Sequence, residues 1–547
     1  MASQAESLWV IILASKCKDF ICQNYYPFIF LIVFICFSWL TLSFLYWTFP
    51  GGPAWGKHYF WSKYYSNPIP GPRGFPVVGS MNLMADLAHQ HLEAMAKVLK
   101  AKRVMALSIG ETRLIVTSDP DVAKEILNSC VFSDRPVKET AYSLMFNRAI
   151  GFAPYGVYWR TLRRIAATHI FCPKQMIISE AQRSRIATQI VREIGRQSKE
   201  VIGKCFEIRK LLKRASLCNM MSLVFGRDYV VEELYCINNS EAAELSRLVE
   251  EGYDLLGQLN WSDHLPWISS FDPQNIRVRC SKLAPQVYRL VTRIISEHRA
   301  SALKKLPTET SRAFVDVLLA QHLNNLSEAD MVAVLWEMIF RGTDTVAVII
   351  EWILARMVLH PTIQAKVHEE LNRVVGQSRA ITESDVSALV YLGAVVNEAF
   401  RLHPPGPLLS WARLATTDTT IDGYHVPAGT TAMVNMWAIT RDPSVWTDPL
   451  SFTPERFMTK HSPDDDFSMM GSDLRLAPFG SGIRICPGRF LGLTTVTFWV
   501  ASILHKFEIL QSDHNPVDLS EVLRLSCEKA NPLVAKFLPR RRYVSHW

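Results

Sequence analysis

Several features are missing from this 547-residue sequence, and each absence excludes a class of protein. The eleven cysteines are odd in number and irregularly spaced, and no two form a Cys-x-x-Cys pair. This argues against a disulfide framework and for a reducing compartment. No internal repeat with the period of a solenoid or propeller is found, and no long low-complexity tract. No basic run is interleaved with aromatic residues, so we expect no nucleic-acid partner.

What is present describes a packed globular body with a membrane element. Apolar residues make up 49% of the chain and charged residues 20%, which excludes a disordered or fibrous protein. The net charge of +8 has two readings. It is either a solvated basic surface or a footprint for anionic lipid or an acidic partner.

The N-terminal region lacks charge over a long stretch, because no charged side chain occurs from Phe20 to Gly56. Residues 27–47 are almost wholly apolar and would span roughly 31 Å as a helix, about the thickness of a hydrocarbon core. A cleaved signal peptide would have a shorter core and small residues before its cleavage site. We therefore expect a short lumenal N-terminus at 1–24 and a transmembrane signal-anchor at 25–47.

Charge flanking this segment predicts the topology. Lys57, Lys63 and Arg73 follow it without acidic partners, which places the body in the cytosol by the positive-inside rule. The sequons at Asn238, Asn260 and Asn325 should then all stay unglycosylated. Four prolines occur between Pro68 and Pro76, and they favour a semi-rigid strut over helix or central strand. Residues 48–76 are thus expected to be linker and strut, and residues 77–547 a single folded domain.

The body is predicted to be mainly α with small β-sheets (α+β). Apolar and polar residues alternate over 100–118 around Gly110, which is typical of a hairpin, and short strand patterns return over 418–434. Ser327 and Asp330 form a capping box that opens an apolar run continuing to about Leu359. A helix of that length would measure about 45 Å and could cross a whole domain.

The strongest chemical motif is the loop from Phe479 to Gly488, which contains Cys486. Glycines stand six and four residues before the cysteine and two after it. They permit tight turns and a close approach of backbone to a planar group. A thiolate in an apolar site needs a metal or hydrogen-bond donors to stay ionised. Phe479 is placed to shield the sulfur, and Arg484 to pair with a buried carboxylate.

A second pattern lies in the middle of the long helix, at residues 341–346. Glycine and threonine weaken helical hydrogen bonding there. Asp344 and Thr345 are read either as an ordinary polar patch or as an acid–alcohol pair that passes protons during oxygen activation. Arg341 needs an anion if it is buried. Three outcomes stay open for it: an ion pair with Asp344, a swing out of the pocket, or binding of a substrate carboxylate.

Two further patterns are weak taken alone. Glu398 and Arg401 have helical i, i+3 spacing among apolar residues, and Arg456 lies downstream, where it could complete a buried network. Trp159 and Arg163 lie in a basic amphipathic helix.

Taken together, these motifs resemble the cytochrome P-450 superfamily in order and spacing, and within it the plant subfamily numbered 78A, associated with organ and seed growth. The resemblance implies the cytochrome P-450 fold with an N-terminal transmembrane helix, and haem b bound through Cys486 as the iron ligand. It implies O2 as co-substrate and catalytic roles for Asp344 and Thr345. The implied haem-binding residues are Trp159, Arg163, Arg413, Phe479, Arg484, Cys486 and Gly488, and Glu398, Arg401 and Arg456 form a structural core.

The resemblance also implies a hydroxylation that inserts one oxygen atom into a small apolar substrate, fatty-acid or lipid-like, to make or modify a plant growth regulator. The chain contains no dinucleotide fingerprint or flavin site, so electrons should come from NADPH through a separate reductase, a partner beside membrane lipid. The expected location is the endoplasmic reticulum membrane, single-pass, with the catalytic domain cytosolic. The rivals are a reductase-independent haem-thiolate isomerase or dehydratase, and a haem or lipid sensor without turnover.

Overall fold

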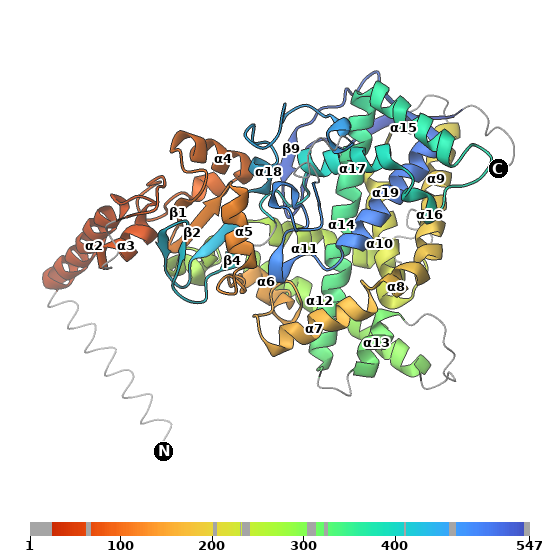
Figure 1. The fold of residues 1–547 in the computed structure, drawn as a ribbon. Helices are drawn as coiled ribbons and strands as arrows, with labels where there is room; N and C mark the ends of the chain where they lie inside the picture. The colour runs from red at the N-terminus through yellow and green to blue at the C-terminus, as the bar shows by residue number, and fades with distance from the viewer. Residues whose placement is uncertain are drawn as a thin grey trace, which may run out of the picture.

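A computed structural model describes residues 25–61, 67–200, 205–229, 231, 241–302, 313–321, 326–409, 412–458 and 467–540. Helices dominate and the sheets are small, as the sequence predicts (Figure 1). The helices of the N-terminal half are α2 (Tyr25–Trp47), α3 (Pro53–Trp61), α4 (Ala88–Val98), α5 (Pro120–Asn128), α6 (Glu139–Ser143), α7 (Val157–His169), α8 (Pro173–Ile178), α9 (Glu180–Glu200), α10 (Arg209–Phe225) and α11 (Glu241–Gly257). The remaining helices are α12 (Ile276–Ala302), α13 (Phe314–Gln321), α14 (Glu328–Leu359), α15 (Pro361–Val374), α16 (Glu383–Val386), α17 (Val390–Leu402), α18 (Met436–Ile439) and α19 (Arg489–Lys506).

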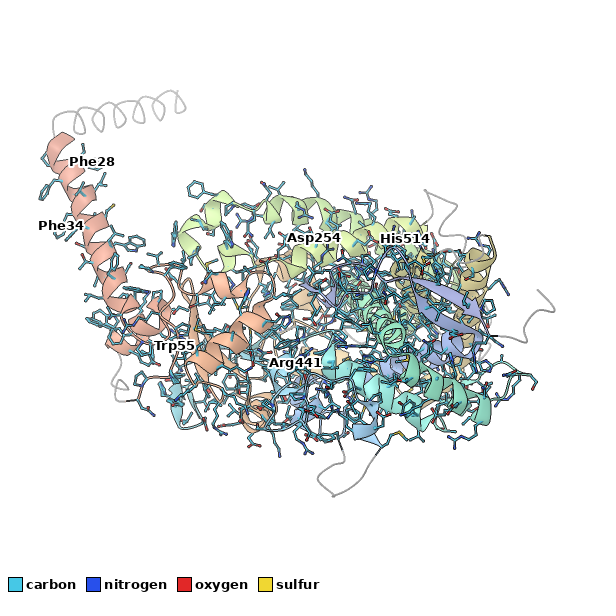
Figure 2. The ribbon with its side chains drawn as sticks, turned by 90° about the horizontal axis from the view of Figure 1, so that it is seen from above. Phe28, Phe34, Trp55, Asp254, Arg441 and His514 are labelled. Carbon is cyan, nitrogen blue, oxygen red and sulfur yellow. The ribbon has the colours of Figure 1, made fainter. Side chains whose placement is uncertain are left out.

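Helix α2 projects from one end of the body (Figures 1 and 2). Among the described residues it is the one single helix long and apolar enough to cross a membrane, and none of the residues in its apolar stretch is buried against the protein. Phe28 and Phe34 extend from it away from the body (Figure 2). A helix that is apolar on every face and unpacked is typical of a membrane span, so α2 is consistent with a membrane anchor.

The segment between anchor and strut is a packed element. Helix α3 carries Trp55, which is fully buried and donates from Nε1 to the carbonyl of Leu107 at 3.1 Å. The Tyr59 hydroxyl accepts from the amide of Ile69 at 2.9 Å, which fixes the start of the proline-rich strut on α3. The packed body therefore begins within the segment that the sequence assigns to a linker.

The predicted hairpin and the last of the strands predicted over 418–434, β7 (Thr431–Val434), belong to the sheet nearest the anchor, which has the order β1-β2-β7-β4. The other two strands in that range, β5 (Thr419–Ile421) and β6 (Tyr424–Val426), pair with each other in a separate two-stranded sheet. Strands β1 (Met105–Ile109) and β2 (Thr112–Thr117) are the expected hairpin, with Gly110 at a φ of +54° in its turn. Strand β2 pairs in parallel with β7, and β4 pairs with β7 antiparallel. The other strands are β3 (Phe206–Glu207), β4 (Arg413–Leu414), β5 (Thr419–Ile421), β6 (Tyr424–Val426), β7 (Thr431–Val434), β8 (Phe507–Gln511), β9 (Glu521–Leu523), β10 (Cys527–Lys529) and β11 (Val534–Pro539).

Helix α14 runs through the middle of the helical part, packed against α10, α17 and α19 (Figure 1). The capping box predicted at its start is present, with Ser327 and Asp330 bonded reciprocally. The helix ends at Leu359, and α15 leaves it at 109° from Pro361. Most of its residues are buried. A continuous helix in the core can therefore present side chains from several turns to one internal cavity.

Candidate functional site

A cavity of about 270 Å³ lies between the middle of α14 and the loop that contains Cys486. Its wall comes from segments far apart in the chain, including residues near 135–151, 337–346, 405–413 and 478–496. Cys486, Thr345 and Arg341 all line it. Tyr253, on α11, also lines it. Leu525 and Ser526, on the connection between β9 and β10, are lining residues that no sequence pattern indicates.

The Cys486 loop has the tight geometry that its glycines predict. Gly480 and Gly482 have φ values of +72° and +66°. A Cβ on Gly482 would lie 2.1 Å from the carbonyl oxygen of Leu127, so no larger residue fits without a shift of backbone. The Cys486 amide donates to the carbonyl of Phe479 at 3.0 Å, which closes the loop. The loop thus presents the Cys486 thiol at the cavity wall beside the Phe479 ring.

Guanidinium groups gather on the same wall. Arg484 donates to the carbonyls of Ser133 (2.8 Å) and Ala153 (2.7 Å), and it lies over the ring of Trp159. Arg413 donates to Ser481 at 3.3 Å, but its second terminal nitrogen is buried without a hydrogen-bond partner. Burial lowers the pKa of Arg484 to about 10 and that of Arg413 to about 9. A buried cation with an unused donor calls for an anion.

Arg163, Trp159 and Gly488 also lie where the resemblance predicts, on the cavity wall. Arg163 donates to the carbonyl of Ile485, next to the cysteine. The Trp159 indole donates to Ile150 at 2.9 Å, which holds the ring beneath Arg484. Arg135 joins Arg163, Arg413 and Arg484 on this wall, and the sequence analysis did not predict it. Burial lowers the pKa of Arg135 well below its ordinary value. No local pattern around Arg135 distinguishes it from a surface arginine.

The residues present fit a haem. The cavity offers a cysteine sulfur in a loop of close-approach glycines, apolar walls, and a cluster of guanidiniums in which a terminal nitrogen of Arg413 is buried without a hydrogen-bond partner. The propionates of a haem would supply carboxylates for these guanidiniums, because arginine pairs with carboxylates bidentately. Flat apolar porphyrin edges suit the rings of Phe479 and Trp159.

The acid and alcohol on α14 face different cavities. Thr345 lines the large cavity, whereas Asp344 lines a second one of about 160 Å³ beside it. Asp344 Oδ1 lies 2.9 Å from Lys213 Nζ on α10. Burial raises the pKa of the Asp344 carboxyl, and the Lys213 ammonium offsets part of that rise. The helix continues unbroken here, and Thr343 donates back to the carbonyl of Ile339 at 2.7 Å.

Two of the three outcomes open for Arg341 are wrong. Asp344 pairs with Lys213 instead of Arg341. Arg341 stays at the cavity wall and does not swing out. Its ion-pair partner is Glu337, one turn earlier, at 3.9 Å. The sequence analysis does not name Glu337 as a partner, although the two residues have i, i+4 spacing on one helix.

The structural triad is assembled as the resemblance implies. Arg401 makes two hydrogen bonds to the Glu398 carboxylate, at 2.7 and 2.8 Å, and both side chains are fully buried. Arg456 donates to the same carboxylate at 3.1 Å. Arg401 also donates to the carbonyls of Thr440 and Pro449, at 2.7 Å each. The network ties α17 to the following loops, and its three side chains line neither the large cavity nor the second one.

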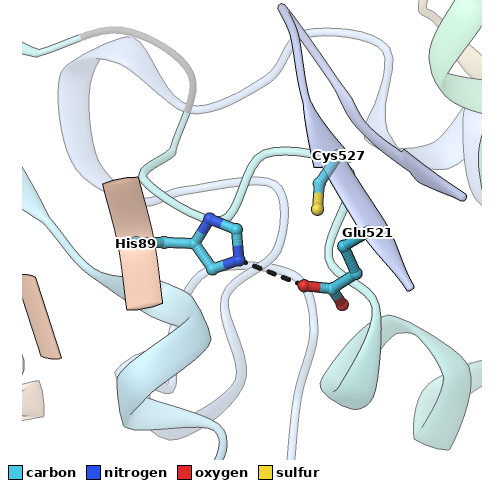
Figure 3. A group of neighbouring side chains, drawn as sticks. All are labelled: His89, Glu521 and Cys527. Carbon is cyan, nitrogen blue, oxygen red and sulfur yellow. Dashed lines mark hydrogen bonds and ion pairs between the residues drawn. The ribbon is translucent and has the colours of Figure 1, made fainter. Parts of the chain in front are cut away.

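Another buried cysteine, Cys527, lies on β10 beside His89 and Glu521 (Figure 3) and is not among the residues that line the large cavity. Its sulfur is grouped with His89 and Glu521, whose ligand atoms lie within 4.8 Å of one another. The Glu521 carboxylate accepts from His89 Nε2 and from Gln90 Nε2, both at 3.1 Å. Burial raises the pKa of the Cys527 thiol well above its ordinary value. The bonds that join His89 and Gln90 to the Glu521 carboxylate make this group a hydrogen-bonded cluster.

Comparison with known proteins agrees with this geometry. The model of the family described as Cytochrome P-450 matches residues 69–532. A protein of Glycine max named cytochrome P-450 78A3 is 60% identical over 537 residues, covering 98% of this chain and 99% of its own length. Cytochrome P-450 78A9 of Arabidopsis thaliana is 64% identical over 507 residues, covering 92% and 93%. A flavonoid 3'-monooxygenase of Oryza sativa is 33% identical, covering 86% and 90%.

Proposed function

The chain belongs to the cytochrome P-450 family, and on that premise we propose that Cys486 is the thiolate ligand of a haem b held in the large cavity. The chain is a haem-thiolate monooxygenase, since the family uses haem b and O2 with electrons delivered by a reductase. The observation that carries the assignment to Cys486 is its place on the wall of the cavity that Arg163, Arg413 and Arg484 also line, with a terminal nitrogen of Arg413 buried and unpartnered.

Cys527 is the alternative ligand, and three observations disfavour it. It is absent from the residues that line the large cavity, its thiol pKa is raised by burial, and it lies beside the Glu521 carboxylate. A neighbouring carboxylate opposes formation of a thiolate. Cys486 instead has Arg163 in its electrostatic neighbourhood, and a cation favours the ionised sulfur.

The residues that would hold the haem follow from the geometry. Arg163, Arg413 and Arg484 would bind the propionates, with Trp159 supporting Arg484. Phe479 would shield the sulfur, and Gly488 allows close approach. When bound, the haem supplies oxygen activation, and a thiolate ligand favours cleavage of the O–O bond.

The protein's own contribution is to position substrate, exclude water and move protons. Asp344 would take protons from the second cavity, which Lys213 also lines, and Thr345 would pass them into the large cavity. Retention of both groups favours oxygen activation over isomerisation of a peroxide, because only the former consumes protons at this point.

The proposal extends to the enzyme's substrate, its electron donor and its location in the cell. The substrate is a small apolar molecule, fatty-acid or lipid-like, because the wall of the large cavity includes Met220, Met338 and Leu525. Electrons come from an NADPH-dependent reductase on the same membrane. The protein is anchored by α2 in the endoplasmic reticulum with its body in the cytosol. The product regulates plant growth, as resemblance to the 78A subfamily implies.

The test is the carbon monoxide difference spectrum of the reduced, haem-loaded protein, compared with Cys486→Ala and the matched control Cys527→Ser. We expect a far-red-shifted Soret band in the wild type and in Cys527→Ser, and its loss in Cys486→Ala. Loss of the band only in Cys527→Ser would assign the ligand to Cys527. Substrate consumption without NADPH and reductase would favour the isomerase.

A further inference from the structure

The acid and the alcohol on α14 that we assign to proton transfer line different cavities. Asp344 lines the second cavity and Thr345 lines the large one. A proton held by Asp344 therefore needs a further group that reaches both cavities, because protons pass between groups within hydrogen-bonding distance. Among the described residues, Tyr253 and Ser526 are the two that line both cavities.

Ser526 is the shared residue that contacts the acid itself. It lies on the connection between β9 and β10 and is 3% exposed. Its hydroxyl is hydrogen-bonded to the Asp344 carboxylate. A serine hydroxyl can donate one hydrogen bond and accept others, so Ser526 can accept a proton from the side of the second cavity and release its own into the large cavity.

The fold holds Ser526 in place from both sides. Its carbonyl accepts from the amide of Arg524 at 3.1 Å. The next residue, Cys527, donates from its amide to the carbonyl of Pro405 at 2.9 Å. The carbonyl of Cys527 accepts from the Trp352 indole of α14 at 3.2 Å, which ties this connection to the helix that carries the acid. A proton-transfer group held in this way keeps its distance to the acid.

Tyr253 is less suited to the transfer. Its ring packs against the ring of Phe340 on α14, with the centroids 4.5 Å apart. Its hydrogen bond with Asp344 is to the backbone, whereas Ser526 bonds to the carboxylate. Burial raises the pKa of the Tyr253 hydroxyl well above its ordinary value, so the phenol stays neutral. Tyr253 therefore forms part of the wall between the cavities, and Ser526 joins them.

Protons can reach the acid from solvent through the second cavity. Arg524 and Asp254 line this cavity and have exposed side chains. Burial raises the pKa of the Asp344 carboxyl, and the Lys213 ammonium and the Ser526 hydroxyl offset part of that rise. These opposing effects let the carboxyl both take up a proton and give it back.

We propose that Ser526 carries protons from Asp344 in the second cavity to the large cavity, where oxygen is activated. In each transfer the protonated Asp344 carboxyl donates its proton to Ser526 Oγ, and the hydroxyl hydrogen of Ser526 passes to an acceptor in the large cavity. A carboxylate and a neutral hydroxyl are left, and the hydroxyl turns back to Asp344, so one proton crosses and no electron moves. The inference rests on the proposed function and adds a residue to the relay of Asp344 and Thr345.

The first measurement needs no turnover. In the full-length, haem-loaded protein, the infrared band of the protonated carboxyl that disappears in Asp344→Asn is followed across pH. Ser526→Ala removes a hydrogen bond donated to the carboxylate, so the band should persist to higher pH than in the wild type. Ser246→Ala is the matched control, because Ser246 lines the second cavity and is not among the residues that line the large one. It should leave the titration unchanged.

The second measurement is the rate of NADPH-dependent oxygen consumption per haem, with reductase and with dodecanoic acid as the probe substrate, in H2O and in D2O. Ser526→Ala should be slower by about 100-fold, the lower end of what a positioned proton-transfer group contributes. D2O should slow Ser526→Ala more than it slows the wild type, because proton delivery then limits the rate. Ser526→Thr restores a hydroxyl and should recover most of the rate, and Ser246→Ala should match the wild type.

Several results would overturn the proposal. One is a wild-type rate in Ser526→Ala. A second is a slow Ser526→Ala with the isotope effect and the carboxyl titration of the wild type, or with loss of the carbon monoxide band, since either would give Ser526 a structural role. A third is a loss of rate confined to Tyr253→Phe, which would assign the transfer to Tyr253. A wild type without the carbon monoxide band would instead refute the proposed function, and the infrared titration would still report whether Ser526 bonds to Asp344.

Discussion

Lys213 on α10 and Asp344 on α14 form an ion pair of 2.9 Å across the second cavity. Lys213 also lies 3.4 Å from the Glu528 carboxylate, so the ammonium is shared between two acids. These carboxylates help to raise the pKa of Lys213 despite its burial. Lys213 thus favours the ionised form of Asp344, the residue on α14 to which we assign proton transfer.

Replacing Lys213 by methionine should move the pH dependence of turnover. Without the ammonium, burial raises the pKa of Asp344 further. Turnover that needs the Asp344 carboxylate would then be lost at a higher pH as the solution is acidified, by about one pH unit. The measurement is the rate of product formation per enzyme molecule across pH 5.5–8.5, with Lys213→Arg as the charge-preserving control. Superimposable profiles for wild type and Lys213→Met would exclude Asp344 from the relay.

His403 gives a second pH dependence, of stability rather than turnover. Its Nε2 accepts from Arg356 at 3.0 Å, and its ring stacks on Trp352 at 3.9 Å. Burial lowers the pKa of His403 from 6.5 to about 3. A depressed folded pKa means that the unfolded chain binds the proton more readily between these values. This contribution to stability is therefore complete above pH 6.5 and is lost as pH falls toward 3.

The test is the free energy of unfolding at a series of pH values, for wild type, His403→Gln and His514→Gln. We expect His403→Gln to be less stable at pH 7.5 but to lose stability more slowly with acid, by at most about 1.4 kcal/mol per pH unit. His514 is exposed, so His514→Gln should follow the wild type. A slope for His403→Gln as steep as that of the wild type would show that other buried groups account for the acid sensitivity.

Local patterns predicted much of this molecule. The β1–β2 hairpin follows from alternation around Gly110, and the start of α14 follows from Ser327 and Asp330, because both depend on residues close in sequence. The tight turns of the Cys486 loop were also predictable, because they depend on glycines that lie within a few residues of the cysteine.

Long-range partners were not predictable in the same way. The pairing of Asp344 with Lys213 depends on how α10 packs against α14, which no spacing within either helix encodes. Arg135 joins the guanidinium cluster because the fold brings its loop to the cavity. The sequence places helix α3 in the linker, because its short apolar segment lies between the anchor and the proline-rich strut. Trp55 is part of the core because it contacts β1, and no pattern within α3 predicts that contact.

The Glu398–Arg401 pair predicts a large loss of stability when one partner is removed. Glu398→Ala would leave a fully buried guanidinium without its carboxylate, at a cost of about 3–5 kcal/mol. Glu398→Gln keeps an oxygen that can accept from the Thr453 amide, now 2.9 Å from Glu398 Oε1, and should cost less. Chemical denaturation and haem content measure both effects. Equal stability of Glu398→Ala and wild type would contradict a structural role for this triad.

The anchor gives a prediction about topology that the natural sequon at Asn260 cannot test. Asn260 is 4% exposed and donates from Nδ2 to Glu139 at 3.2 Å, so it should escape glycosylation on either side of the membrane. The paired changes Gln377→Asn and Arg379→Thr place a sequon on an exposed loop instead. With the body in the cytosol this sequon stays unmodified, whereas Ala5→Asn, which creates a sequon before the anchor, becomes glycosylated.

Removing residues 2–49 should release the protein from membranes, because α2 carries the apolar surface that would lie in lipid (Figure 2). Leu40→Arg is a subtler variant, since an arginine near the middle of a span costs about 2.5–3.5 kcal/mol of insertion free energy. Alkaline extraction should leave the wild type in the pellet and move a part of Leu40→Arg, and most of the truncated chain, to the supernatant. Truncated protein that stays in the pellet would mean that exposed aromatic residues of the body, such as Trp61 (74% exposed) and Phe271 (80% exposed), bind the bilayer without α2.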